Sequence, residues 1–207
     1  MARTLAEFHG ILADLLTDAR RRYDGRPGPG EPGYLDIESQ NATTAWRHLA
    51  VTVHGYANGA HVRGIRPTWE AFWADGMDRS KFLKLIARRS RIVRAISNGG
   101  DMDTMLVDDS VRYWENELAT GIMTRVDHVE AARRYNKPDA VRRIGLELEL
   151  SLTVAQAYTG VDMATLRRTV QGCGEVRPVY PTYDADGNRK WEAHPLFDLI
   201  TANRPGV

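Results

Sequence analysis

Two adjacent arginines, Arg167 and Arg168, follow a glycine-containing turn in the segment TVAQAYTGVDMATLRRTVQG, from Thr153 to Gly172. A guanidinium group is planar and always charged, and its fork of N–H donors matches a guanine edge or a phosphate. The chemistry available to this pair is therefore nucleic-acid recognition. The competing interpretation is a helical face whose arginines simply lie in water.

The elements that must position this pair are two helices joined by a turn. Val154, Ala157 and Leu166 have the spacing of residues that face the interior of a helix-turn-helix. Gly160 can adopt the left-handed conformation that such a turn requires. The segment 153–172 is accordingly predicted to be a helix-turn-helix.

The residues that follow favour a β-hairpin and a short closing helix. Extended runs from Val176 to Tyr183 and from Arg189 to Glu192 flank the sequence DADGN, whose Asp-Gly pair suits a hairpin turn. The run HPLFDLI is typical of a short helix. The apolar residues expected to enclose a small core are Val154, Ala157, Leu166, Val170, Trp191, Leu196, Phe197 and Ile200.

In this order, the runs ATLRRTVQ, DADGNRKW and HPLFDLI resemble the excisionase and MerR-like family of winged helix-turn-helix proteins. The resemblance extends from Thr153 to the C-terminus. It implies binding to double-stranded DNA through a recognition helix and a wing. The major-groove candidates that it implies are Met163, Thr165, Arg167 and Arg168, and the wing candidates are Asn188, Arg189 and Lys190.

The wing departs from the family pattern. Gly172, Cys173 and Gly174 precede it, and Pro178 and Pro181 make its first strand irregular. The aspartates of the DADGN turn would repel phosphate. Wing contact with DNA is therefore the weaker half of the expectation.

An internal echo adds a second arginine pair. The run VEAARRYNKPDAVRRI, from Val129, aligns without gaps on VAQAYTGVDMATLRRT, from Val154, and matches Arg142 and Arg143 with Arg167 and Arg168. The offset is too short for two independent domains. A tandem repeat and one compact bundle with a shared amphipathic pattern are the two interpretations. Arg142 and Arg143 are additional DNA-binding candidates.

The strongest charge segregation lies between Arg79 and Arg94, where seven basic residues occur without an acidic one. Arg88, Arg89 and Arg91 are candidates for phosphate contacts, in a further helix-turn-helix with a basic second helix. A solvated face whose long side chains cover a core is an equally good interpretation.

The N-terminal half is expected to be helical. Apolar spacing predicts a helix from Leu5 that ends in the basic run Arg20-Arg21-Arg22. Further helices are predicted over 41–56, 67–75, 79–94 and 110–122, with a Pro/Gly-rich loop at 24–33. The expected fold is mainly α, with a helical domain at 1–121 and a winged helix-turn-helix domain at 122–207.

Composition restricts the other classes of function. The net charge of +1 over 207 residues requires any DNA-binding surface to come from local charge segregation, and a single cysteine excludes an intramolecular disulfide. The acidic run at 101–109 lacks the pattern of an EF-hand and is predicted to be a solvated loop. No metal, cofactor or catalytic activity is expected. The N-terminus resembles neither a signal peptide nor a membrane span, so a cytoplasmic protein is expected.

These features together predict a double-stranded DNA-binding protein of phage or plasmid type, acting as a transcriptional regulator or an excisionase-like architectural factor. Self-association into a homo-oligomer is compatible with the sequence. The alternative is a structural or assembly protein, such as a virion or head-tail component. In that case the arginine faces and the acidic run would pair charge to charge between subunits.

Overall fold

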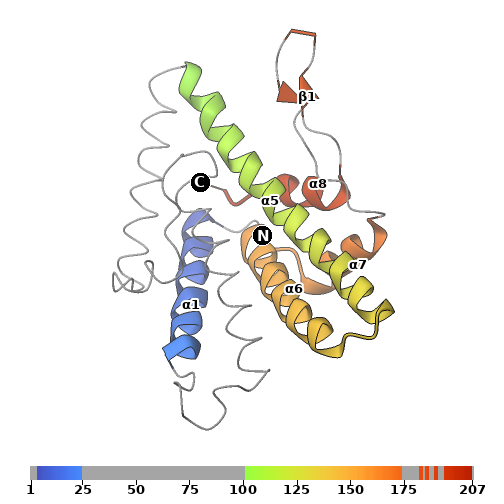
Figure 1. Ribbon diagram of the computed structural model, residues 1–207. Helices are drawn as coiled ribbons and strands as arrows, with labels where there is room; N and C mark the ends of the chain where they lie inside the picture. Colours follow the sequence, from blue (N-terminus) through green and yellow to red (C-terminus); the bar gives the residue numbers. More distant parts are fainter. Residues whose placement is uncertain are drawn as a thin grey trace.

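The computed structural model describes residues 4–24, 101–173, 182–183, 185–186, 189–190 and 194–206. Within these ranges the chain forms the helices α1 (Leu5–Asp24), α5 (Asp101–Arg134), α6 (Pro138–Thr159), α7 (Met163–Gly172) and α8 (Pro195–Ala202), shown in Figure 1. The described part of the protein is thus mainly α, as predicted. The Pro/Gly-rich loop beyond Asp24 and the helices predicted over 41–94 lie outside the described residues.

The prediction of an acidic loop at 101–109 is wrong, because these residues form the first turns of α5. Aspartates are poor helix formers in a helix interior, but they are favourable near the positive N-terminal end of the helix dipole. Asp101 and Asp103 occupy that end. The helix then continues unbroken to Arg134, so the predicted domain boundary at residue 121 falls inside α5.

The turn between α5 and α6 is a fully hydrogen-bonded helix C-cap. Asn136 has a positive φ of 51°, and its N–H donates to the carbonyl of Arg133 at 3.0 Å. The N–H of Lys137 donates to the carbonyl of Ala132 at 2.8 Å. This pair of bonds is the Schellman pattern, with asparagine in the left-handed position that glycine more often takes. Pro138 then opens α6 at a position where its missing N–H costs nothing.

The turn between α6 and α7 has the predicted form. Gly160 is left-handed, with φ 71° and ψ 1°, and its N–H donates to the carbonyl of Gln156 at 2.9 Å. Asp162 caps the start of α7. The internal echo therefore corresponds to two successive helix-turn-helix corners, α5–α6 and α6–α7, which share α6.

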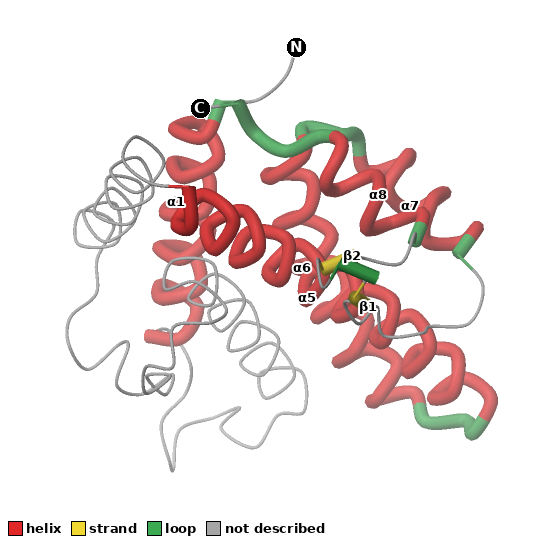
Figure 2. The backbone as a smooth tube through the Cα atoms, turned by 90° about the horizontal axis from the view of Figure 1, so that it is seen from above, coloured by secondary structure: helices red, strands yellow, loops and turns green. Residues whose placement is uncertain are grey.

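One apolar core joins all five described helices. Phe8 of α1, Trp114 of α5 and Tyr158 of α6 are buried together, with ring centroids 4.9 Å apart for Phe8 and Tyr158 and 5.0 Å apart for Trp114 and Tyr158. In Figure 2, α7 and α8 lie side by side, and they contact each other. The described members of the predicted C-terminal core are all buried: Val154, Ala157, Leu166, Val170, Leu196, Phe197 and Ile200.

The two ends of the described chain meet. The N–H of Leu5 donates to the carbonyl of Gly206 at 2.8 Å, and Thr4 forms an isolated parallel bridge with Gly206. Thr4 also caps α1: its hydroxyl accepts from the N–H of Glu7 at 3.2 Å, while the Glu7 carboxylate accepts from the N–H of Thr4 at 2.7 Å. This reciprocal capping box fixes the start of α1 beside the C-terminal segment.

The prediction of a β-hairpin wing is wrong. Within the described ranges, strands β1 (Thr182–Tyr183) and β2 (Arg189–Lys190) pair only with each other, through Thr182 with Lys190 and Tyr183 with Arg189. Figure 1 shows this two-rung ladder standing clear of the helices, where it forms no wing against them. The sequence contains a physical reason, since Pro178 and Pro181 have no N–H to donate to a longer ladder.

Candidate nucleic-acid interface and two buried glutamates

Helix α7 exposes one basic face. Leu166 and Val170 are buried against the core. The exposed residues of the helix are Ala164, Arg167, Arg168, Gln171 and Gly172. The helix contains two arginines and no acidic residue, so its exposed face carries positive charge.

The start of α7 uses one of the predicted base-reading residues for capping. The N–H of Thr165 donates to Asp162 Oδ1 at 2.9 Å, and the Thr165 hydroxyl donates to Oδ2 at 2.7 Å. These bonds, the hydroxyl bond first, lower the pKa of Asp162. Met163 is half-buried and packs against the core. Of the four α7 candidates, Arg167 and Arg168 are therefore the two that extend into solvent.

Arg167 forms an ion pair across the α6–α7 corner. Its Nη2 lies 2.6 Å from Glu149 Oε2, and both side chains are about half exposed. An ion pair in such a position is weak, because water solvates both partners almost as well when they separate. Arg168, also exposed, makes no hydrogen bond or ion pair with the part of the chain that the structure describes.

The second predicted pair, Arg142 and Arg143, lies on α6, and the two arginines differ in exposure. Arg142 is exposed, whereas Arg143 is half-buried with its Nη1 3.4 Å from Glu147 Oε1. Arg142, Leu146 and Glu149 are all exposed and are spaced by one helical turn. They form a continuous solvent-facing stripe along α6 that leads from Arg142 to the Arg167–Glu149 pair.

The side chains of the other predicted contact residues lie outside the described part of the protein. Arg189 and Lys190 form β2. Asn188, Arg88, Arg89 and Arg91 lie outside the described residues.

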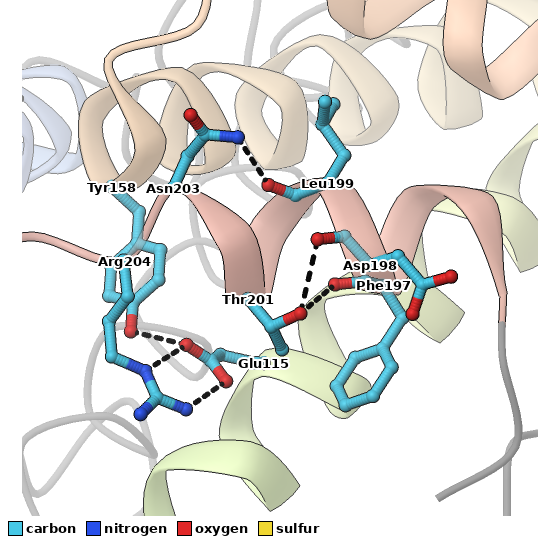
Figure 3. Close-up of polar contacts among 8 residues, drawn as sticks. All are labelled: Glu115, Tyr158, Phe197, Asp198, Leu199, Thr201, Asn203 and Arg204. Carbon is cyan, nitrogen blue, oxygen red and sulfur yellow. Dashed lines mark hydrogen bonds and ion pairs between the residues drawn. The ribbon is translucent and has the colours of Figure 1, made fainter.

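A buried carboxylate joins α5, α6 and the C-terminal segment, as Figure 3 shows. Glu115 is fully buried; its Oε1 accepts from Arg204 Nε at 2.8 Å and from the Tyr158 hydroxyl at 2.7 Å. Its Oε2 accepts from Arg204 Nη2 at 2.8 Å. The bidentate geometry neutralises the carboxylate and ties the end of the chain to the core.

A second buried glutamate joins α5 to α6. Glu147 is 5% exposed, and its carboxylate lies 3.4 Å from Arg125 Nε of α5 and 3.4 Å from Arg143 Nη1 of its own helix. Both buried carboxylates therefore pair with arginines, and these ion pairs connect neighbouring elements of the bundle. Among the described residues, no three histidine, cysteine, aspartate or glutamate side chains gather closely enough to hold a metal ion.

Glu115 is not among the residues predicted to be functional, although the sequence contains a signal for it. Val111, Glu115, Leu118 and Ile122 are spaced as one helical stripe, so an acidic residue occupies an apolar position. A charged residue on a core-facing stripe needs a buried partner. That partner, Arg204, is far away in the sequence, and no local spacing identifies it.

The described fold is that of an α-helical bundle with two helix-turn-helix corners. None of the described helices combines the length and the apolar character needed to span a membrane. No protein-family model matches the chain, and no curated protein or solved structure matches it. The resemblance to the excisionase and MerR-like family thus stays a prediction, without the wing.

Proposed function

We propose that the protein binds double-stranded DNA through the exposed face of α7, as a transcriptional regulator or an architectural factor. The observation that carries the proposal is the face itself, along which the small Ala164 is followed by Arg167, Arg168 and Gln171. A helix that enters the major groove needs small and hydrogen-bonding side chains on the side that meets the bases. Helix α7 presents both kinds of side chain and contains no acidic residue.

The scaffold behind α7 supports this use. The left-handed Gly160, the Asp162 cap and the buried Leu166 and Val170 hold the helix in one orientation. Base recognition requires such a fixed helix, because a contact displaced by about 1 Å loses its geometry.

The ion pair between Arg167 and Glu149 does not oppose DNA binding strongly. An exposed pair contributes about 0–1 kcal/mol, whereas a bidentate arginine–guanine contact contributes about 1–3 kcal/mol of discrimination. Separation of Arg167 from Glu149 therefore costs little when Arg167 turns to a guanine or a phosphate. Arg168 needs no such exchange with the described residues.

The test is selection from a randomised duplex library by the full-length protein, followed by fluorescence anisotropy on the enriched duplex. We expect a guanine-containing site, and we expect Arg168→Ala to lose about 1–3 kcal/mol of discrimination at one base pair. Arg21→Ala is the matched control, because Arg21 is an exposed arginine on α1, away from this face. Selection without enrichment would contradict the proposal. Large assemblies in light scattering without DNA would then favour the assembly protein.

A further inference from the structure

The turn between α5 and α6 presents a second basic surface, which we call the basic turn: Arg133, Arg134, Tyr135 and Lys137. All four residues are exposed, and Tyr135 is 72% exposed. The chain from Ala131 to Pro138 contains no acidic residue, although the exposed Glu130 and Asp139 flank it. Three cations and one aromatic ring thus project from a single corner of the bundle.

The helix dipole explains part of this composition. Arginines in the last turn of α5 are favourable because they face the negative end of that helix. The dipole does not explain Lys137, which lies beyond the helix end, or the exposure of a large aromatic ring. Three exposed cations gathered in one turn favour an anionic partner, and the Tyr135 ring lies among them.

The basic turn is also held rigidly. The Schellman bonds of Asn136 and Lys137 close the turn, and the N–H of Tyr135 donates to the carbonyl of Ala131 at 3.0 Å. The α6–α7 corner differs, since there the N–H of Gly160 makes a single bond to the carbonyl of Gln156. A rigid turn loses little conformational entropy when a partner binds.

Helix α6 connects the basic turn to the face of α7. The exposed stripe runs from Arg142 through Leu146 to Glu149, which holds Arg167. From Lys137 to Glu149 the helix rises by about 18 Å, at about 1.5 Å per residue. This distance is close to half of a B-DNA turn of about 34 Å.

We infer that the basic turn is a second DNA contact, which binds phosphates about half a helical turn from the groove read by α7. The inference rests on the proposed function of α7. Arg133, Arg134 and Lys137 would pair with backbone phosphates, and the Tyr135 ring would pack on the adjoining sugars. Such contacts add affinity and register without adding sequence preference.

The experiment compares the enriched duplex at two lengths, one covering only the selected site and one extended by about one helical turn on each side. The variant Arg133→Gln/Arg134→Gln/Lys137→Gln should lose the affinity gained on extension. For this variant on the long duplex, the slope of log K against log salt should be less steep by about 2.7, since each lost phosphate contact reduces the slope by about 0.9. The enriched sequence should not change. Arg21→Gln is the control, and circular dichroism verifies that the variants are folded.

Tyr135 provides an independent readout. Tyr135→Ala should weaken binding without a change in the salt slope, because a neutral ring releases no counterion. Tyr135→Phe should bind like the wild type. Equal losses for both variants would contradict packing of the ring on the sugars.

The outcomes separate this inference from the proposed function. Sequence preference with an unchanged salt slope in the triple variant would overturn the basic turn alone. Binding without sequence preference, combined with a shallower slope in the triple variant, would overturn base reading by α7 and support the basic turn. Absence of duplex binding, or binding to anionic phospholipid vesicles alone, would overturn both.

Discussion

Substitution of Arg204 by alanine should destabilise the whole bundle, although Arg204 lies near the C-terminus. The Glu115 carboxylate is 0% exposed. After the change, the Tyr158 hydroxyl is the one donor to this carboxylate that remains among the described residues. Removal of one partner from a buried ion pair costs about 3–5 kcal/mol, because the other charge stays desolvated. Arg204 itself is 33% exposed, so water can reach its former position. We therefore expect the lower end, about 3 kcal/mol.

This loss corresponds to a melting temperature lower by about 6–12 °C, since about 1 kcal/mol shifts a protein of this size by about 2–4 °C. Thermal and urea unfolding, followed by circular dichroism, provide the measurement. Arg21→Ala is the control and should change the free energy of unfolding by less than about 0.5 kcal/mol.

A paired substitution distinguishes loss of the charge partner from loss of packing. Glu115→Gln combined with Arg204→Met removes both charges, retains volume and keeps an acceptor for the Tyr158 hydroxyl, so it should regain at least half of the lost free energy. The reasoning is refuted if Arg204→Ala costs less than about 1 kcal/mol. It is also refuted if the double variant is no more stable than Arg204→Ala.

Three further predictions concern the corners and the caps. Gly160→Val places a β-branched residue in the left-handed region and should cost at least about 1 kcal/mol in urea unfolding, and an unaffected midpoint would contradict the turn geometry. His194 accepts the Phe197 N–H through Nδ1, and burial lowers the pKa of His194 although Asp198 opposes this. The neutral form is thus favoured on folding, so stability should fall as pH drops below about 6.5, and His194→Asn should remove that slope. Glu149→Gln releases Arg167 and should strengthen duplex binding up to about fivefold, which corresponds to about 1 kcal/mol. Weaker duplex binding by this variant would contradict the prediction.

Local patterns in the sequence predicted the corner between α6 and α7 correctly. Apolar spacing identifies Leu166 and Val170 as buried, and a glycine after a helix indicates a left-handed turn. The hairpin was only partly predictable. An Asp-Gly pair favours a turn, but the length of the ladder depends on donors that the prolines at 178 and 181 do not supply.

The candidate site was less predictable than the helices, because its contacts join residues far apart in the sequence. Arg167 and Arg168 look equivalent as neighbours, yet α6 supplies a carboxylate to Arg167, and no described partner holds Arg168. Thr165 looks like a base-reading residue, but its hydroxyl completes the Asp162 cap. The packing of α7 on α6 distinguishes the two arginines, whereas the Thr165 contact is local, since Asp162 lies three residues before it.

Two glutamates on α6 show how one helix serves both the fold and the proposed interface. Glu147 is buried and contacts Arg125 of α5. Separation of these two residues would leave their charges desolvated inside the bundle. Glu149 faces solvent and contacts Arg167 of α7, where water can replace it at little cost. Because the two positions lie on opposite sides of α6, α7 can exchange Glu149 for a nucleic acid while α5 and α6 stay paired. The basic turn, fixed at the α5–α6 corner, would then keep its distance from α7 during binding.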